Sequence, residues 1–360
     1  MRKVLIAGLI LSVISVFSSY AVQADSGLKL GLSFPPVKAE KHRAFTLKHL
    51  KKLGIEHIRF AVAWENIEPV KGKFKWEAFD KRIKFIVDNN LSLLLTVQSN
   101  GPSWACDGRK NNKSCVYRNE EDFRAFVEAL LSRYPNKIDK IQFGNEWPSK
   151  WWYIGEADDY ARFSNILYDA VQKFSPRTKV VLGGISIGQL RALAACEGRI
   201  DSIFDDQGNI YEKKYLLKYC QSDKSAELKQ RVDHGLKMSR YDIVDIHLYD
   251  DPQNWNIYYD IIRAMAPGKP IIVSEFGGPN IFVENYSDEY HAKRVGDYLR
   301  ALKDMGIEEA YYFQLVEPKT KVAHSRSGLI SAPNELEEKP AYNVLAEFNR
   351  ALRNQGQIEE

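Results

Sequence analysis

The sequence predicts a (β/α)8 TIM barrel, the α/β fold in which parallel strands alternate with helices around a closed ring. Short apolar runs alternate with amphipathic helical patterns along the chain, and eight such runs are present. No composition shift or low-complexity linker divides the sequence, so residues 25–360 are expected to form one domain. Taking 24 residues from 360 leaves 336, a normal length for this fold.

The eight candidate strands are apolar and short enough to be buried in a parallel sheet. They cover residues 28–34, 57–64, 92–99, 140–146, 179–186, 242–249, 270–276 and 310–316. Segments such as 76–90 and 120–135 lie between them, and their apolar residues recur every three or four positions, as in amphipathic helices. Several helices are expected to end near glycine, asparagine or proline, namely Gly54, Asn89, Asn90, Pro135, Pro176 and Gly306.

An open doubly wound sheet is the alternative fold, but no glycine-rich phosphate loop opens any of the helices. The region 189–240, between the fifth and sixth strands, is longer than a plain helical crossover. We interpret it as an insertion that contains Cys196, Cys220 and a turn at 205–209 (DDQGN).

The first 24 residues have the pattern of a signal peptide: Arg2 and Lys3 precede an apolar stretch at 4–17, and small residues end at Ala24. A membrane anchor is the alternative, but the apolar stretch is shorter than the roughly 20 residues that span a bilayer. We expect cleavage after Ala24, a secreted or periplasmic protein, and no membrane span. Removing Arg2 and Lys3 leaves 49 basic against 47 acidic residues. This near-neutral balance argues against nucleic acid as a partner, and we expect a monomer.

The chain has four cysteines, and an even number in an exported protein indicates disulfides. Three pairings are possible. The local pairing, Cys106 with Cys115 and Cys196 with Cys220, is preferred because each pair brackets one polar insertion. No CxxC, HxH or HExxH spacing occurs, so we expect neither a metal nor another cofactor.

Polar and aromatic side chains gather at the carboxyl ends of the predicted strands, where barrel enzymes place their working groups. Arg59 lies within the second strand, and the others end or follow strands: Trp64, Asn100, Asn145, Glu146, His247, Tyr249, Glu275, Gln314 and Glu317. For either glutamate alone, a structural salt bridge is as good an explanation as a catalytic role. Two such glutamates, on strands four and seven, favour a catalytic pair.

Two carboxyl groups facing each other across a barrel mouth can divide the work of cleaving a glycosidic bond. One is protonated and donates to the leaving oxygen, while the other is ionised and attacks the anomeric carbon. A separation of about 5–5.5 Å between them marks the retaining route. A basic neighbour keeps the nucleophile ionised, and Arg59 is the predicted partner of Glu275.

The glutamates and two longer stretches also resemble a known clan. Asn145-Glu146 and Glu275, together with residues 64–105 and 325–348, are similar to the clan A retaining glycoside hydrolases, nearest to family 39 or the cellulase-like family 5. The first stretch has a "Pro, short gap, Gly" turn and Gly-Pro-x-Trp; the second has Lys-Pro-Ala-Tyr. The resemblance covers most of 28–350 and implies a barrel with Glu146 as general acid/base and Glu275 as nucleophile.

The resemblance further implies that Asn145 binds the sugar 2-hydroxyl, that Arg59 orients and charge-stabilises Glu275, and that His247 and Tyr249 line the cleavage subsite. For His247 a core histidine satisfied by a neighbour is the alternative. Many relatives have a tryptophan at strand eight, where this chain reads YYFQLVEP. Phe313 or Gln314 must replace it, which leaves the substrate open.

Five tryptophans fall in predicted loops: Trp104, Trp147, Trp151, Trp152 and Trp255. Sugar rings stack their C–H faces on indole, so we expect Trp104 and Trp147 to line saccharide subsites, with Trp64 and Asn100 also contacting substrate. Packing within the loops is the alternative, above all for Trp152 and Trp255. A disulfide beside Trp104 would limit the entropy lost when a sugar chain is held.

These residues together predict an exported retaining glycoside hydrolase that cleaves an oligo- or polysaccharide by double displacement without a cofactor. One alternative is a non-catalytic carbohydrate-binding barrel, but binding alone does not require an acid and nucleophile pair. A transglycosylase, which transfers the sugar to another sugar, stays open as the second alternative.

Overall fold

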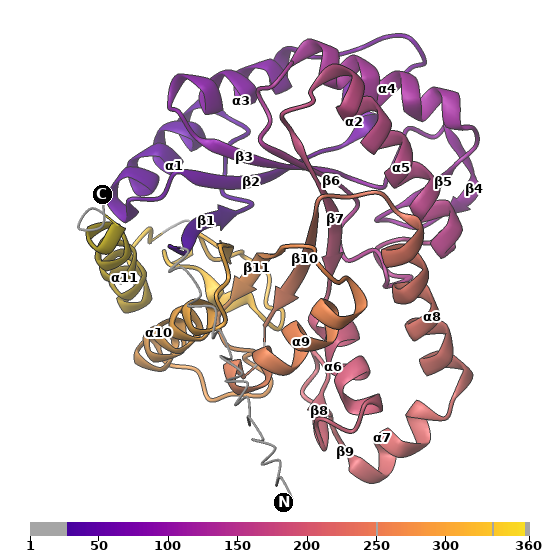
Figure 1. The fold of residues 1–360 in the computed structure, drawn as a ribbon. Helices are drawn as coiled ribbons and strands as arrows, with labels where there is room; N and C mark the ends of the chain where they lie inside the picture. Colours follow the sequence, from indigo (N-terminus) through magenta and orange to yellow (C-terminus); the bar gives the residue numbers. More distant parts are fainter. Residues whose placement is uncertain (1–26, 250, 333–334, 357–360) are drawn as a thin grey trace, which may run out of the picture.

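The protein is a closed barrel of eight parallel strands, in a computed structural model that describes residues 27–249, 251–332 and 335–356. The strands follow one another around the barrel in the order β1-β12-β11-β10-β7-β6-β3-β2 (Figure 1). They are β1 (Lys29–Ser33), β2 (His57–Val62), β3 (Ser92–Val97), β6 (Lys140–Phe143), β7 (Lys179–Ile185), β10 (Ile243–Leu248), β11 (Ile271–Gly277) and β12 (Glu309–Phe313). The predicted (β/α)8 fold is confirmed, and the open sheet was wrong.

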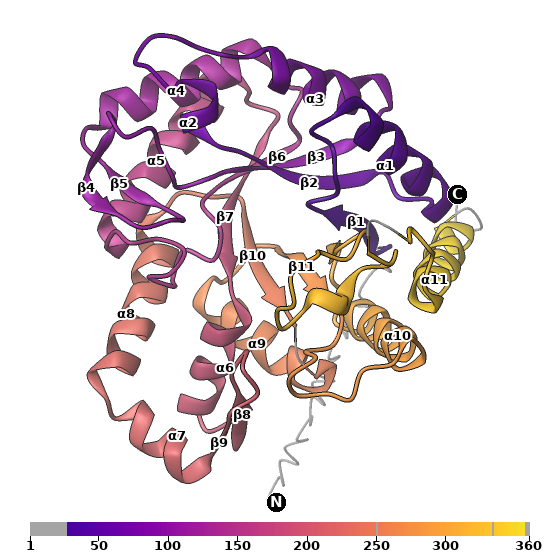
Figure 2. The same cartoon turned by 180° about the vertical axis from the view of Figure 1, so that it is seen from behind.

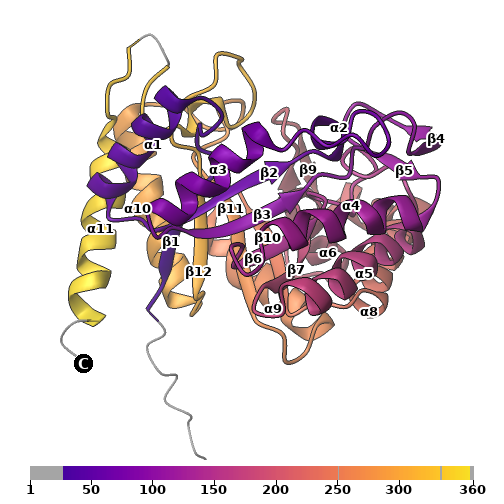
Figure 3. The same ribbon diagram turned by 90° about the horizontal axis from the view of Figure 1, so that it is seen from above.

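Helices surround this barrel on its outer side (Figures 1 and 2). They are α1 (Glu40–Leu53), the short α2 (Trp64–Ile67), α3 (Glu77–Asp88), α4 (Glu120–Arg133), α5 (Ala157–Phe174), α9 (Trp255–Met265), α10 (Asp288–Asp304) and α11 (Pro340–Gly356). Seen from above, α10 and α11 lie together on one flank, and α4 and α5 lie together on the other (Figure 3).

The sequence predicts the ends of several helices to within one or two residues of where the structure ends them. On α3 the buried side chains Phe79, Ile83 and Ile86 recur at helical spacing and form the face that meets the barrel. Gly54 follows α1 with a left-handed φ of 66°, a conformation that suits glycine at a helix end. Asn119 caps α4, since its side chain accepts a hydrogen bond from the backbone of Asp122.

Most barrel strands end earlier than predicted, and at three of them this changes the setting of candidate site residues. β2 ends at Val62, so Trp64 begins α2 instead of ending a strand. β6 ends at Phe143, so Asn145 and Glu146 lie in the loop that follows it. β12 ends at Phe313, which leaves Gln314 just beyond the strand. Catalytic loops of a barrel begin at these strand ends.

The region 189–240 lies between β7 and β10, as predicted. It contains most of α6 (Ile187–Cys196), the β8–β9 hairpin (Ser202–Phe204 and Ile210–Glu212), α7 (Lys213–Cys220) and α8 (Asp223–Met238). The local disulfide pairing is confirmed: Cys196–Cys220 joins α6 to α7, and Cys106–Cys115 joins β4 (Cys106–Lys110) to β5 (Cys115–Tyr117). In Figure 1 the region extends from one side of the barrel, with α8 against α5 and α6 against α9.

The insertion is anchored on Trp147, which follows Glu146 directly. The Trp147 indole is fully buried and stacks on Tyr160 of α5 with ring centroids 4.1 Å apart. Gly235 of α8 lies against the same ring, and a Cβ at that position would overlap it. Arg231, also on α8, donates a hydrogen bond to the backbone oxygen of Trp147 at 3.1 Å. The close approach of α8 therefore depends on the missing side chain at Gly235.

The predicted signal peptide, residues 1–24, lies outside the described residues. Within the part of the chain that is described, no helix has both the length and the apolar character needed to cross a membrane.

Gly235→Ala is expected to lower the free energy of unfolding by about 1–3 kcal/mol, because the added methyl group forces the Trp147 ring or α8 to shift. Gly188→Ala is the matched control: Gly188 is also helical, and the nearest atom to a new Cβ there is Ser186 Oγ at 3.9 Å. Its stability should be unchanged or slightly higher. Urea denaturation of both variants measures the difference; equal stabilities would contradict the packing described.

Candidate active site

Glu275 of β11 is buried at the barrel mouth and is held by two donors. Arg59 Nη1 donates to its Oε1 at 2.5 Å, and the Tyr249 hydroxyl donates to its Oε2 at 2.7 Å. The predicted contact between Arg59 and Glu275 is therefore present. Hydrogen bonds from a guanidinium and a phenol both favour the ionised form of a carboxyl group.

Arg59 is fully buried on β2 and ties several strands together through one rigid, planar group. Its Nη2 donates to Asn145 Oδ1 at 2.7 Å, its Nε to Thr96 Oγ1 at 3.2 Å, and its Nη1 also reaches Ser33 Oγ at 3.3 Å. The guanidinium thus fixes Asn145 relative to Glu275. Because Oδ1 of Asn145 is committed to Arg59, a ligand hydroxyl would be met by its Nδ2 donor group.

His247 lies between the two glutamates. The pairing of β10 with β11 shifts register after Ile246, and this irregularity sets His247 opposite Glu275. The imidazole is fully buried, with Nδ1 2.9 Å from Glu146 Oε1 and 3.7 Å from Glu275 Oε2. Gly184 of β7 leaves room for the ring, because a Cβ there would overlap it.

A buried polar network behind His247 was not predicted. His247 Nε2 lies 3.1 Å from Ser274 Oγ and 3.4 Å from Asp245 Oδ2, and Asp245 is fully buried. The backbone N–H of Ser274 donates to Asp245 at 2.8 Å, and Gln142 Nε2 donates to the same carboxylate at 3.2 Å. A sequence signal for Asp245 existed: it precedes His247 by two residues on a strand, so both side chains face the same way.

Glu146 approaches Glu275 closely from the loop after β6. One carboxyl oxygen of Glu146 and one of Glu275 lie within 4.8 Å of each other. This separation fits the retaining arrangement of about 5–5.5 Å and is shorter than the roughly 6.5–9.5 Å of inverting enzymes. Glu146 adopts a left-handed φ of 46°, which is uncommon outside glycine and typical of functional sites.

The surroundings move the pKa values of the two glutamates in opposite directions. Burial raises the pKa of Glu146, and the hydrogen bond and charge of His247 offset this only in part. Burial acts upward on Glu275 as well, but the charges of His247 and Arg59 and the hydrogen bonds from Tyr249 and Arg59 outweigh it, so its pKa is lowered. Such a division assigns acid and nucleophile roles to two carboxyl groups.

His247 is charged at neutral pH. Burial alone would lower its pKa, but Glu275, Asp245 and Glu146 together raise that pKa to about 10. Donor atoms of Glu146, His247 and Glu275 lie within 4.8 Å of one another, a spacing that a metal ion accepts. A histidine must be neutral to bind a metal. A metal ion at this position would therefore have to displace a proton from His247.

The insertion reaches the site through Asp206, in the turn of the β8–β9 hairpin. Asp206 is exposed, and its charge contributes to raising the pKa of Glu146. Asn280 Nδ2, from the loop after β11, donates to the backbone oxygen of Asp206 at 3.4 Å. The sequence marks DDQGN as a turn, but its distance from Glu146 depends on the fold of the whole insertion.

Phe313 and His324 flank Tyr249 beside the nucleophile. The half-buried ring of Phe313 meets Tyr249 edge-on at 6.2 Å, and the His324 ring lies 4.6 Å from the same tyrosine. Gln314 follows, and its backbone oxygen accepts from the N–H of Leu329 at 3.1 Å. Of the two residues expected at the tryptophan position, Phe313 is the one in contact with Tyr249.

Two tryptophans predicted to contact sugar are buried in the protein, so that prediction was wrong. Trp64 stacks on Phe126 at 5.2 Å, and Trp147 stacks on Tyr160; both indoles are fully buried. The loops after β2 and β6 need apolar packing of their own, and these side chains provide it. Trp255 is likewise buried, in α9, as the packing alternative expected.

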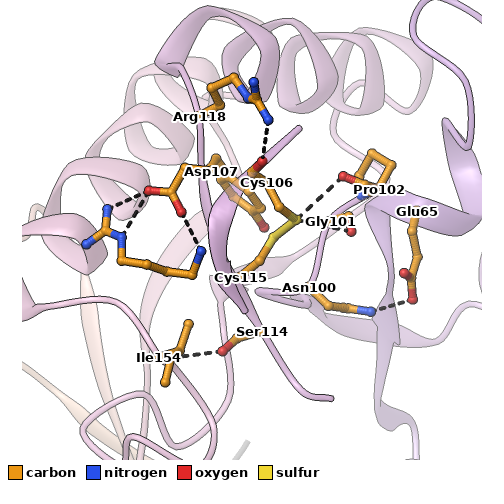
Figure 4. Close-up of a disulfide and its surroundings, with 12 residues drawn as sticks. Glu65, Asn100, Gly101, Pro102, Cys106, Asp107, Ser114, Cys115, Arg118 and Ile154 are labelled. Atoms are coloured by element: carbon orange, nitrogen blue, oxygen red, sulfur yellow. Dashed lines mark hydrogen bonds and ion pairs between the residues drawn. A yellow bond between two sulfur atoms is a disulfide. The ribbon is translucent and has the colours of Figure 1, made fainter. Parts of the chain in front are cut away.

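Asn100 lies in the loop after β3, near the Cys106–Cys115 disulfide (Figure 4), and Trp104 belongs to the same loop, two residues before Cys106. Trp104 is half-buried, and its Nε1 donates to the backbone oxygen of Glu68 at 3.3 Å. Asn100 Nδ2 donates to Glu65 Oε1 at 2.6 Å. Their bonded partners belong to the α2 region, and a role in substrate binding stays a prediction for both.

Solved structures of glycoside hydrolases share this fold. An exo-β-1,4-mannosidase from Opitutaceae bacterium strain TAV5 superposes with a TM-score of 0.63 at 14% identity, over 91% of this chain and 60% of that one. A family 39 glycoside hydrolase from the gut symbiont Bacteroides cellulosilyticus WH2 gives 0.64 at 15%, over 92% and 65%. The GH5_18 protein from Streptomyces cattleya, solved with GlcNAc, gives 0.63 at 13%, over 91% and 80%.

At this low identity the structural likeness shows the fold alone, and the chain spans less than two thirds of the length of the first two structures. No curated protein sequence matches the chain significantly. The family model described as cellulase (glycosyl hydrolase family 5) matches residues 32–313, well over half of the chain. The sequence resembles glycoside hydrolase families 39 and 5, and this match identifies family 5. The chain belongs to the cellulase family, glycosyl hydrolase family 5, whose members are retaining O-glycosyl hydrolases.

Proposed function

We propose that this protein hydrolyses O-glycosidic bonds of an oligo- or polysaccharide by double displacement, with Glu146 as general acid/base and Glu275 as nucleophile. One observation carries the proposal: two carboxyl groups with oxygens within 4.8 Å of each other have pKa values shifted in opposite directions. This is the arrangement that retaining hydrolysis requires.

In the first step a Glu275 oxygen forms a bond to the anomeric carbon while the bond to the leaving oxygen breaks. The proton of Glu146 passes to that oxygen. Arg59 and Tyr249 hold the attacking carboxylate, because each donates a hydrogen bond to one of its oxygens. Asn145 Nδ2 donates to the neighbouring sugar hydroxyl, so the ring is oriented by the same guanidinium that orients the nucleophile.

In the second step Glu146 acts as a base. It takes a proton from a water molecule whose oxygen bonds to the anomeric carbon, and the ester bond to Glu275 breaks. His247 supports this change of role, because its charged ring lies 2.9 Å from the Glu146 oxygen that becomes negative when the proton leaves. The sugar leaves with its original anomeric configuration.

A binding protein without turnover has no use for such a pair, which makes the carbohydrate-binding alternative weaker. A transglycosylase uses the same first step and differs only in the acceptor of the second. We propose water as the acceptor and an exported protein as the setting. The signal-peptide pattern of residues 1–24 and two disulfides, which persist in oxidising compartments, support export.

Glu146→Ala and Glu275→Ala are each expected to lower kcat by about 10³- to 10⁴-fold on the best substrate of a polysaccharide and aryl-glycoside panel, with little change in Tm. Azide fills the space left by either side chain. It should restore turnover with retained configuration in Glu146→Ala and with inverted configuration in Glu275→Ala.

Glu65→Gln is the control, since Glu65 is exposed at the same rim and bonds to Asn100 away from the two catalytic carboxyl groups. Its kcat should stay near that of the natural protein. Near-normal turnover in Glu146→Ala or Glu275→Ala, or the opposite azide products, contradicts the assigned roles.

The pH dependence of kcat/KM is expected to be bell-shaped. Activity falls at low pH when Glu275 becomes protonated, below a lowered pKa, and falls at high pH when Glu146 loses its proton, above a raised pKa. Glu146→Gln should remove the alkaline limb and keep the acid limb when assayed on a dinitrophenyl glycoside, whose leaving group needs no proton. An alkaline limb that persists would rule out Glu146 as the acid.

A further inference from the structure

A groove lies between α1, α3 and the loops that follow β1 and β2, and one of its lining residues, Phe34, contacts Arg59 of the catalytic site. Its volume is about 670 Å³. Ala61 lines its inner part and follows Arg59 by two residues on β2, so both face the barrel interior. Phe79 and Arg82 of α3 line its outer part. The groove therefore approaches the barrel mouth near Arg59, the partner of the proposed nucleophile.

One phenylalanine ring is partly open to this groove. Phe34, Phe60 and Phe79 all line it, but Phe60 and Phe79 are 2% exposed and lie beneath Arg82, whereas Phe34 is half-buried. Phe34 stands between the groove and the catalytic residues, because the Arg59 guanidinium lies 4.7 Å from its ring centroid. A sugar unit that extends from the cleavage point would meet the half-buried Phe34 ring here, whose apolar face suits the C–H surface of a sugar.

The ionised side chains on the groove are all basic. Lys38, Lys75 and Arg82 line it, and no carboxylate is among its lining residues in the described part of the chain. None of the three has an ion-pair partner among the described residues. Lys81, which is next to Arg82 in sequence but does not line the groove, is paired with Glu77 at 2.8 Å. The groove thus has a positive charge that the protein itself does not neutralise.

Arg82 is the one of these three basic side chains that is partly buried. Its guanidinium lies 4.1 Å from the Phe60 ring centroid and 5.4 Å from that of Phe79. Its Nε is buried and has no hydrogen-bond partner among the described residues, and burial lowers the pKa of Arg82 to about 10. A buried donor without a partner is costly, and a planar guanidinium matches the geometry of a carboxylate.

We propose that the groove binds a uronic-acid unit of the saccharide substrate, with the sugar ring against Phe34 and the carboxylate on Arg82 and Lys75. This rests on the proposed hydrolytic function and adds a substrate class to it, an acidic polysaccharide. A neutral sugar unit would leave the three basic side chains of the groove without a counter-charge. An apolar anion such as a fatty acid would satisfy Arg82 but has no reason to occupy a groove that approaches the barrel mouth near Arg59.

Isothermal titration calorimetry on the full chain carrying Glu275→Gln, which binds substrate without cleaving it, tests this proposal. The probes are hexasaccharides of alginate and hyaluronan, which contain uronic acid, the neutral cellohexaose and mannohexaose, and dodecanoate as an anion without sugar. We expect at least one uronate hexasaccharide to bind about 10-fold more tightly than the neutral ones. Adding Arg82→Met should abolish that preference, and adding Lys75→Met should reduce it.

Lys81→Met is the matched control on the same helix and should leave the preference unchanged. Because Lys75 is exposed, its variant stays informative if Arg82→Met fails to fold. Equal binding of neutral and uronate hexasaccharides, a preference unaffected by both Arg82→Met and Lys75→Met, or tighter binding of dodecanoate overturns the proposal. If the natural protein binds uronate selectively but cleaves no glycan, the proposed hydrolytic function is contradicted while the proposed uronate binding is supported.

Discussion

The contact of 2.5 Å between Arg59 and Glu275 is the interaction on which the rest of the site depends. Two buried charges are costly unless each is paired and its remaining donors are bonded. Arg59 meets this condition by donating also to Asn145, Thr96 and Ser33. The same bonds fix the nucleophile, the proposed sugar-binding amide and the strands that carry them. Loss of the arginine would therefore alter both charge and shape at the barrel mouth.

The charge balance around this pair explains why the two glutamates differ. Arg59 and His247 contribute two positive charges to the buried site, and Glu275 and Asp245 contribute two negative ones. An ionised Glu146 would add a third negative charge that no buried cation balances, so its protonated form is favoured. When Glu146 gives its proton to the leaving oxygen, Glu275 loses its charge to the ester, and the balance is restored. The site thus keeps its net charge through the proposed reaction.

Much of this arrangement could be predicted from the sequence, because the signals were local. Each barrel strand is a short apolar run, and a polar residue at its carboxyl end faces the mouth; this was enough to select Glu146 and Glu275. Arg59, within the second strand, was selected as a basic partner for Glu275. Asp245 could have been found by the two-residue alternation on its strand. Trp147 could not, since its burial depends on Gly235, which is distant in sequence and recognisable only once α8 is in place. Asp206 was also missed, because its approach to Glu146 depends on the fold of the whole insertion.

Carbon-13 NMR of the protein labelled at glutamate side-chain carboxyl carbons measures the central claim directly. The resonances of Glu146 and Glu275 are assigned by their loss in Glu146→Gln and Glu275→Gln, and their shifts are followed as the pH is raised. The structure predicts that Glu275 ionises first, below the usual range of a glutamate, and that Glu146 ionises later, above it. Titration of both at an ordinary glutamate pKa, or in the reverse order, would contradict the division of roles between them.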